Sequence, residues 1–195
     1  VCVAGYDEQG RCVRPVLPPP GIQECSLYAN GNSIIFPFAS VTYDLIDHAP
    51  QPPHTEDYLF HPAAVQSGGA LDMDDRPAFL LRTLSPNVAA IFGQPIYADA
   101  GHYVLDGSGP RSLGTVQPSR PPQVLFQTGQ DGVIKPRLAF EDEAGAHYRL
   151  AVTDLAWRYQ ADFFRRTENL PVEALTARMQ AALQSKAVFL RIGLA

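Results

Sequence analysis

Hydrophobic residues alternate with polar ones along much of this chain, and this spacing predicts β-strands. Apolar and β-branched residues fill segments 1–6 and 11–17, and a polar turn that ends at Gly10 separates them. This pattern predicts a β-hairpin. Three prolines follow at 18–20 and end the hairpin, because proline has no backbone N–H to donate to a neighbouring strand. The apolar, β-rich residues of 33–46 predict a further strand region.

The second half of the chain changes from a strand pattern to a helical one. Apolar segments at 124–128, 133–140 and 147–152 are separated by turns and predict an antiparallel meander. Apolar residues then recur at helical spacing and predict two helical pieces. These positions are Trp157, Ala161, Phe164, Val172, Leu175, Met179 and Leu183. With a closing strand at 187–194 and a short helix at 77–84, the sequence predicts a mainly β fold with a C-terminal helical segment.

A stretch rich in Gly, Pro and Ser, residues 107–122, shows little periodicity and predicts a linker. It divides the chain into 1–106 and 123–195. The 18 Pro and 15 Gly of the sequence favour turns and short strands, because proline removes a backbone donor and glycine weakens helix interiors. We therefore expect two small β-rich domains, the first with an inserted loop and helix and the second with a helical insertion.

The charges are distributed unevenly. The net charge of −5 disfavours generic phosphate binding, whose affinity comes largely from Lys and Arg. Up to residue 105 there are four cations against eleven acids, whereas from residue 146 onward there are seven cations against four acids. A basic surface is therefore expected in the last third of the chain.

Several features predict a cytoplasmic protein without a membrane segment. The longest uncharged stretch, 25–43, contains Asn, Ser and Pro and predicts a turn and a strand, not a membrane span. The first residues lack the basic start and apolar run of a signal peptide. Cys2, Cys12 and Cys25 lack the spacing of a zinc site, so we expect reduced thiols.

None of the specific catalytic motifs is present, neither a nucleophile elbow nor a zinc-protease or phosphate-binding motif. One stretch of acids and histidines could hold a divalent metal and activate water for phosphodiester hydrolysis. Its residues are His48, His54, Glu56, Asp57, His61, Asp72, Asp74 and Asp75. Their spacing fits no single helix face, so the alternative is a solvated loop with Asp74 or Asp75 capping the next helix. We predict no catalytic residue, no metal site and no cofactor.

Aromatic and arginine residues are interleaved in the first helical piece. The segment contains Trp157, Arg158, Tyr159, Phe163, Phe164, Arg165 and Arg166. Single-stranded nucleic acids are bound by this combination, because bases stack on rings while cations contact phosphates. Alternatively, Trp157 and Phe164 share the core face of the helix. Arg158, Asp162 and Arg165 would then form ion pairs on its outer face.

Arg14 is a second candidate contact. The alternation of the strand around it places Cys12, Arg14 and Val16 on one face. If this face turns inward, the guanidinium group is half-buried and needs an anionic partner. That partner is either a carboxylate of the protein or a bound phosphate.

Five short motifs occur in order along the chain. They are CVAGY at 2–6, CVRPV at 12–16, PHTEDY at 53–58, AVTD at 151–154 with Trp157, and VFLRIGL at 188–194. Together they resemble the ordered signature of the prokaryotic dual OB-containing domain family. The resemblance implies two small OB-like barrels in tandem and recognition of nucleic acid in bacterial conflict systems. An OB barrel has five strands, so the single closing strand leaves the second barrel incomplete or dependent on a strand from the first half.

We therefore expect a binding module for single-stranded DNA or RNA, or for a nucleotide, in a prokaryotic defence context. The expected contact residues are Arg14, Trp157, Arg158, Tyr159, Arg165 and Arg191. Two alternatives stay open. A protein-interaction or scaffolding module suits the acidic first half. A metal-dependent phosphodiesterase would use His54, Glu56, Asp57 and the acidic run from Asp72 to Asp75.

Overall fold

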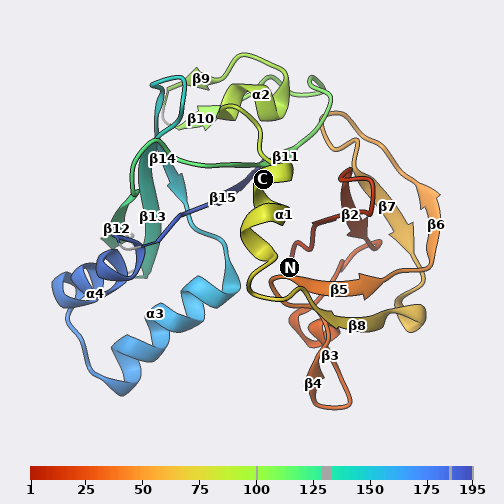
Figure 1. Ribbon diagram of the computed structural model, residues 1–195, viewed down its shortest axis with the longest axis horizontal. Helices are drawn as coiled ribbons and strands as arrows, with labels where there is room; N and C mark the ends of the chain where they lie inside the picture. The colour runs from red at the N-terminus through yellow and green to blue at the C-terminus, as the bar shows by residue number, and fades with distance from the viewer. Residues whose placement is uncertain (100, 129–132, 185, 195) are drawn as a thin grey trace.

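The computed structural model of the protein describes residues 1–99, 101–128, 133–184 and 186–194. Within these residues the chain is mainly β, as the sequence predicts, and it has four α-helices, of which α2 (Val88–Phe92) was not predicted. The N-terminal strands lie in one part of the molecule, and the C-terminal meander with its two helices lies in the other (Figure 1). A pair of strands from distant parts of the sequence lies between them.

A four-stranded sheet organises the N-terminal part. Asp7 forms the predicted hairpin turn, because its Oδ1 accepts hydrogen bonds from the amides of Gln9 and Arg11 at 3.0 and 2.8 Å. The strand over residues 12–16 runs parallel to the strand over residues 57–60, and this pairing places Arg14 opposite Asp57. In spatial order the strands are β1 (Gly5–Tyr6), β2 (Cys12–Val16), β7 (Asp57–Phe60) and β6 (Leu45–His48).

The strand region predicted over 33–46 is interrupted and contributes to three different sheets. Pro37 and Phe38 cause the break, since Pro37 has no amide donor and Phe38 has a φ of +67°. The predicted helix at 77–84 forms with slightly different bounds, but Asp75 at its N-cap makes no side-chain hydrogen bond. The elements are β3 (Tyr28–Ala29) paired with β4 (Asn32–Ser33), β5 (Ala39–Thr42) paired with β8 (Gln66–Ala70), and α1 (Arg76–Arg82).

The predicted linker, 107–122, contains a buried strand. This strand, β11 (Leu113–Val116), pairs antiparallel with β15 (Leu190–Gly193), which is the predicted closing strand in shortened form. Gly114 allows the neighbouring helix to approach, because a Cβ at this position would lie 3.0 Å from the side chain of Ile91. That helix, α2, and a small hairpin precede β11. Their bounds are α2 (Val88–Phe92), β9 (Tyr97–Ala98) and β10 (His102–Tyr103).

The C-terminal part follows the prediction closely. Its meander is antiparallel throughout, and two helices follow it. The first helix begins where the Asp154 carboxylate accepts a hydrogen bond from the amide of Trp157 at 2.7 Å. The bounds are β12 (Gln123–Thr128), β13 (Ile134–Glu141), β14 (His147–Ala151), α3 (Leu155–Thr167) and α4 (Val172–Gln184).

Two hydrophobic clusters form the core. The first joins all three predicted segments of the chain, since it contains Val88, Val116 and Phe140. The second fills the space between the meander and its two helices and is centred on Val124 and Leu175. The division into domains at 1–106 and 123–195 stays a prediction.

The predicted closed barrels are not seen in the described residues. Strand pairing there gives six separate sheets of two to four strands, and none of them closes on itself. The short strands and proline-rich loops explain this result, because closure needs a continuous ladder of hydrogen bonds around the sheet.

Candidate functional site

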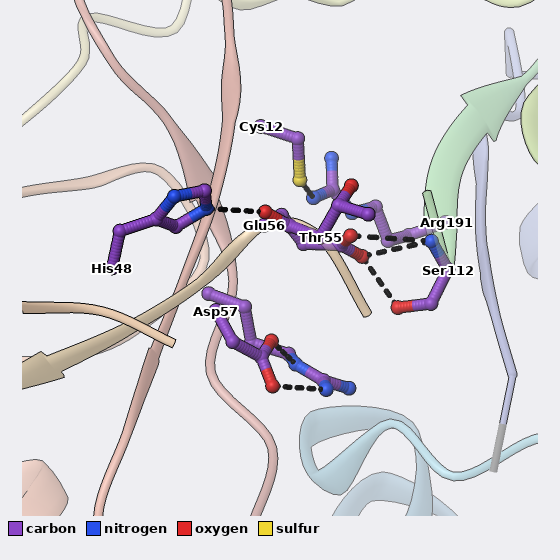
Figure 2. A network of polar contacts seen from close by, with 8 residues as sticks. Cys12, His48, Thr55, Glu56, Asp57, Ser112 and Arg191 are labelled. Carbon is purple, nitrogen blue, oxygen red and sulfur yellow. Dashed lines mark hydrogen bonds and ion pairs between the residues drawn. The ribbon is translucent and has the colours of Figure 1, made fainter. Parts of the chain in front are cut away.

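A network of polar side chains joins the N-terminal sheet to β11 (Figure 2). At its centre is Glu56, which is only 5% exposed. The carboxylate of Glu56 accepts hydrogen bonds from the amide of Ser112 at 3.0 and 3.2 Å and from the Ser112 hydroxyl. The backbone carbonyl of Glu56 accepts a bond of 2.8 Å from the amide of Arg14. We call Glu56, Ser112, Arg14 and Asp57 the polar junction.

Arg14, an expected nucleic-acid contact, has its partner inside the protein. Its Nε and a terminal nitrogen donate to the two carboxylate oxygens of Asp57 at 2.6 and 2.8 Å. The two side chains are 15% and 13% exposed. The hydrogen bond to Asp57 raises the pKa of Arg14 above its usual range, although burial opposes this effect. Of the two partners considered from the sequence, the structure contains the internal carboxylate.

Arg191, another expected contact, lies against the N-terminal hairpin. Its guanidinium carbon is 4.4 Å from the ring centroid of Tyr6, and a terminal nitrogen donates to the Cys12 sulfur at 3.0 Å. Burial raises the pKa of the Cys12 thiol, and the charge of Arg191 reduces this rise. Arg191 is exposed and makes no described contact with α3.

The acid and histidine stretch does not assemble into a metal site. Glu56 and Asp57 already have partners in the polar junction, and His48 donates from Nε2 to the carbonyl of Thr55 at 2.7 Å. The run 72–75 lies beyond β8, in the turn before α1. Across the described residues, no group of three or more His, Cys, Asp or Glu side chains is arranged to hold a metal ion.

Helix α3 separates its aromatic residues onto two faces. Trp157 and Phe164 pack against the second hydrophobic cluster, as the core alternative predicts. The Trp157 Nε1 is buried and has no hydrogen-bond acceptor in the described part of the chain. Tyr159 and Phe163 point away from this core and are 50% and 52% exposed.

The exposed aromatic rings of α3 have arginine neighbours. Tyr159, Phe163 and Arg166 follow one another at i, i+4 and i+7 and therefore share one face of the helix. Arg158 and Arg165 are seven residues apart and lie together on one side of this face. We call these five residues the α3 outer face. Helical spacing from Tyr159 would have added Phe163 and Arg166 to the residues expected from the sequence.

The three arginines of the α3 outer face form no ion pair with another described residue. The outer-face ion pairs considered for Asp162 are therefore absent from the described part of the chain. Tyr159 donates from its hydroxyl to Glu24 Oε2, across a sequence separation of 135 residues. This hydrogen bond raises the pKa of Tyr159.

The protein is thus mainly β with a C-terminal pair of helices. The side chains of its polar junction are hydrogen-bonded to one another, and the α3 outer face exposes aromatic and arginine residues. The model of the family described as dual OB-containing domain matches residues 1–177, and the chain belongs to this family. The predicted resemblance is thus confirmed, and the match ends within α4, before β15. Neither a curated protein nor a solved structure matches the chain. Family membership implies a binding module.

The helices of the described residues are too short or too polar to cross a membrane.

Proposed function

We propose that this protein binds single-stranded DNA or RNA, or a nucleotide, through the α3 outer face. The observation that carries the proposal is the exposure of Tyr159 and Phe163 beside three arginines without a described carboxylate partner. Bases stack on exposed aromatic rings, and guanidinium groups contact phosphates. The family membership supports a binding function of this kind. We further propose a prokaryotic defence or conflict context, which is what the resemblance to the family implies.

The residues have different roles in this proposal. Tyr159 and Phe163 stack on bases, whereas Arg158, Arg165 and Arg166 contact phosphates. Trp157 and Arg14 act inside the protein, where Trp157 packs and Arg14 pairs with Asp57. The guanidinium group of Arg191 lies over the ring of Tyr6 and is not part of the α3 outer face. We retain the two-unit organisation, 1–106 and 123–195, as part of the proposal, with the ligand on the second OB-like unit.

Because the net charge of the protein is −5, we expect the α3 outer face to prefer single strands over duplexes. A protein with excess negative charge repels a polyanion at long range, so affinity has to come from local contacts. Stacking contributes roughly 1–3 kcal/mol per base and does not depend on the base sequence. Binding should therefore be weak for duplexes, whose bases are already stacked, and should decrease as the salt concentration rises.

Fluorescence anisotropy with labelled single-stranded DNA, single-stranded RNA and duplex at two salt concentrations tests the proposal. Replacing Tyr159 and Phe163 by serine should weaken single-strand binding about tenfold or more. The matched control replaces Tyr97 and Tyr103 by serine, which removes two exposed tyrosines of the β9–β10 hairpin. Absence of binding to any single strand at low ionic strength would contradict the proposal.

The arginines have a separate test. The triple substitution R158Q/R165Q/R166Q should reduce the slope of log affinity against log salt by about 2, since each phosphate contact of a single strand contributes about 0.7. The control triple R11Q/R82Q/R120Q removes three exposed arginines elsewhere and should leave the slope unchanged. An equal change in both triples would show that only overall charge matters.

A protein-interaction module is the second candidate, favoured by strand β6. It lies at the edge of the four-stranded sheet, and its residues Leu45 and Ile46 are 43% and 55% exposed. An exposed apolar edge can accept a strand from another protein. Under this function a protein would co-purify with the chain, Ile46→Lys would release it, and oligonucleotides would not bind.

A further inference from the structure

A carboxylate lies within the surface proposed to bind a polyanion. Glu24 belongs to the 3-10 helix η1 (Glu24–Leu27) and accepts the hydroxyl hydrogen bond of Tyr159 through Oε2. Its other oxygen, Oε1, accepts no hydrogen bond from a described residue. A negative charge beside Tyr159 repels phosphates. Nonspecific binding of the phosphate backbone therefore does not explain why a carboxylate lies at this position.

The surroundings of Glu24 suit a base better than a phosphate. Tyr28 follows at the start of β3 and is 53% exposed. Its hydroxyl lies close enough to Tyr159 to contribute to the raised pKa of that residue, after the larger effects of Glu24 and burial. Arg158 is the residue before Tyr159 in α3, and its positive charge slightly lowers the pKa of Tyr159. Figure 1 shows that the N-terminal end of α3 is the end nearer to the N-terminal strands.

The direction of the Tyr159 ring determines which part of a base meets the carboxylate. The Tyr159 hydroxyl contacts Glu24, so the long axis of the ring points at the carboxylate. A base stacked on the exposed ring therefore extends one of its edges toward Glu24. An ionised carboxylate only accepts hydrogen bonds, and its two oxygens can accept about four of them. The bond from Tyr159 thus leaves room for two more donors.

We infer that Glu24 and Tyr159 form a guanine-selective subsite, an inference that rests on the proposed function. Guanine presents two adjacent donors, N1–H and the N2 amino group, on its Watson–Crick edge, and both can donate to one carboxylate. Adenine and cytosine each present a single amino donor next to an acceptor, which the carboxylate repels. Tyr159 stacks on the guanine ring, and Arg158 contacts the adjacent phosphate.

The test uses labelled thymidine oligomers of about eight nucleotides with one central guanine, adenine, cytosine or inosine. Inosine is guanine without the N2 amino group, so it keeps the stacking surface and loses one donor. The guanine oligomer should bind roughly tenfold more tightly than the other three. Equal affinity for guanine and inosine would overturn the inference, while the binding itself would uphold the proposed function. Failure of every oligomer to bind would overturn both.

A matched pair of charge variants separates recognition from electrostatics. Glu24→Gln keeps an acceptor for Tyr159 but replaces one acceptor by a donor, so the preference for guanine should disappear. Glu8→Gln removes the same charge at an exposed position of the first hairpin turn and should keep the full preference. If Glu24→Gln retains the preference, Glu24 only holds α3 against η1 and the inference is wrong.

Discussion

Glu56 and Ser112 are 56 residues apart, and the Glu56 carboxylate accepts hydrogen bonds from both the amide and the hydroxyl of Ser112. Both residues are buried, at 5% and 0% exposure. The contact joins the start of β7 to the start of β11, and β11 pairs with β15 near the end of the chain. A single side chain therefore connects the N-terminal sheet to the strand pair between the two parts of the molecule.

Removing the Glu56 carboxylate should destabilise the protein. Glu56→Ala leaves the amide and hydroxyl of Ser112 buried without an acceptor, which should lower the free energy of unfolding by about 2–4 kcal/mol. Ser112→Ala removes one donor and leaves the backbone amide bond, so we expect a loss of about 1–2 kcal/mol. Urea denaturation of both variants and of the double variant measures these values. Additive losses in the double variant would show that the two side chains do not interact.

The ion pair of Arg14 and Asp57 should contribute to stability, not to ligand binding. Asp57→Ala leaves a mostly buried guanidinium group unpaired, and we expect a loss of about 2–4 kcal/mol. The exposed pair of Arg11 and Asp7 is the control. Arg11→Ala removes this ion pair but keeps the backbone hydrogen bonds to Asp7, so it should lower the free energy of unfolding by at most about 1 kcal/mol. Oligonucleotide affinity of any folded Arg14 variant should equal that of the unaltered protein. A selective loss of affinity in Arg14→Gln would instead make Arg14 a phosphate contact.

Local patterns predicted the C-terminal part of the fold. The meander and the two helices depend on alternation and on helical spacing, which short segments encode without reference to the rest of the chain. Trp157 and Phe164 fell on the core face for this reason. Helix α2 also has a local signal in the sequence, although its five residues are too few to show a helical periodicity. Asn87 accepts a hydrogen bond from the amide of Ala90 at the N-cap, and Gly93 ends the helix with a φ of +60°.

The remaining features depend on distant contacts. Strand β11 lies within a stretch, 107–122, whose Gly, Pro and Ser content is typical of a loop. It is a strand because β15 pairs with it and Ile91 packs on Gly114. The partners of Arg14 and Glu56 are 43 and 56 residues away, so no spacing rule could identify them. The α3 outer face was partly predictable, because helical spacing gives its members. The contact of Tyr159 with Glu24 was not, since it joins opposite ends of the chain.

Asp142 should be essential for the turn between β13 and β14. This carboxylate is 1% exposed and accepts hydrogen bonds from the amides of Val88, Ala144 and Ala146 at 3.0 to 3.1 Å. Asp142→Ala leaves all three donors without an acceptor and should lower the free energy of unfolding by about 3 kcal/mol or more. Asp142→Asn keeps one acceptor oxygen and should lose less. Equal losses in both variants, measured by urea denaturation, would contradict this assignment.

Asp142 should also affect the titration of Tyr148. Burial raises the pKa of Tyr148 most, and the charge and hydrogen bond of Asp142 raise it further. Asp142→Asn removes that charge and should therefore lower the pKa of Tyr148 relative to the unaltered protein. Ultraviolet titration of the tyrosines, compared between Asp142→Asn and Asp142→Asn/Tyr148→Phe, isolates this one group. An unchanged pKa would show that burial alone causes the shift.

The hydroxyl of Tyr43 should destabilise the folded protein, most of all at high pH. It is buried without a described hydrogen-bond partner, and burial raises its pKa to about 12 from 10.0. Between these values the folded protein keeps a proton that the unfolded chain releases, so the free energy of unfolding falls as the pH rises through this range. Below about pH 10 this proton does not contribute to the pH dependence, because both states hold it.

Tyr43→Phe tests both effects. At neutral pH it removes a buried hydroxyl without a partner and should raise the free energy of unfolding by about 1 kcal/mol. The edge-to-face contact with Phe60, with ring centroids 5.1 Å apart, is kept because phenylalanine has the same ring. Urea denaturation at pH 7 and pH 10.5 measures the free energy of unfolding, which should fall less between the two pH values in Tyr43→Phe than in the unaltered protein. Tyr97→Phe is the exposed control and should change the free energy of unfolding by less than about 0.5 kcal/mol at pH 7. A lower stability of Tyr43→Phe at neutral pH would show that the hydroxyl has a hydrogen-bonding partner, such as an ordered water molecule.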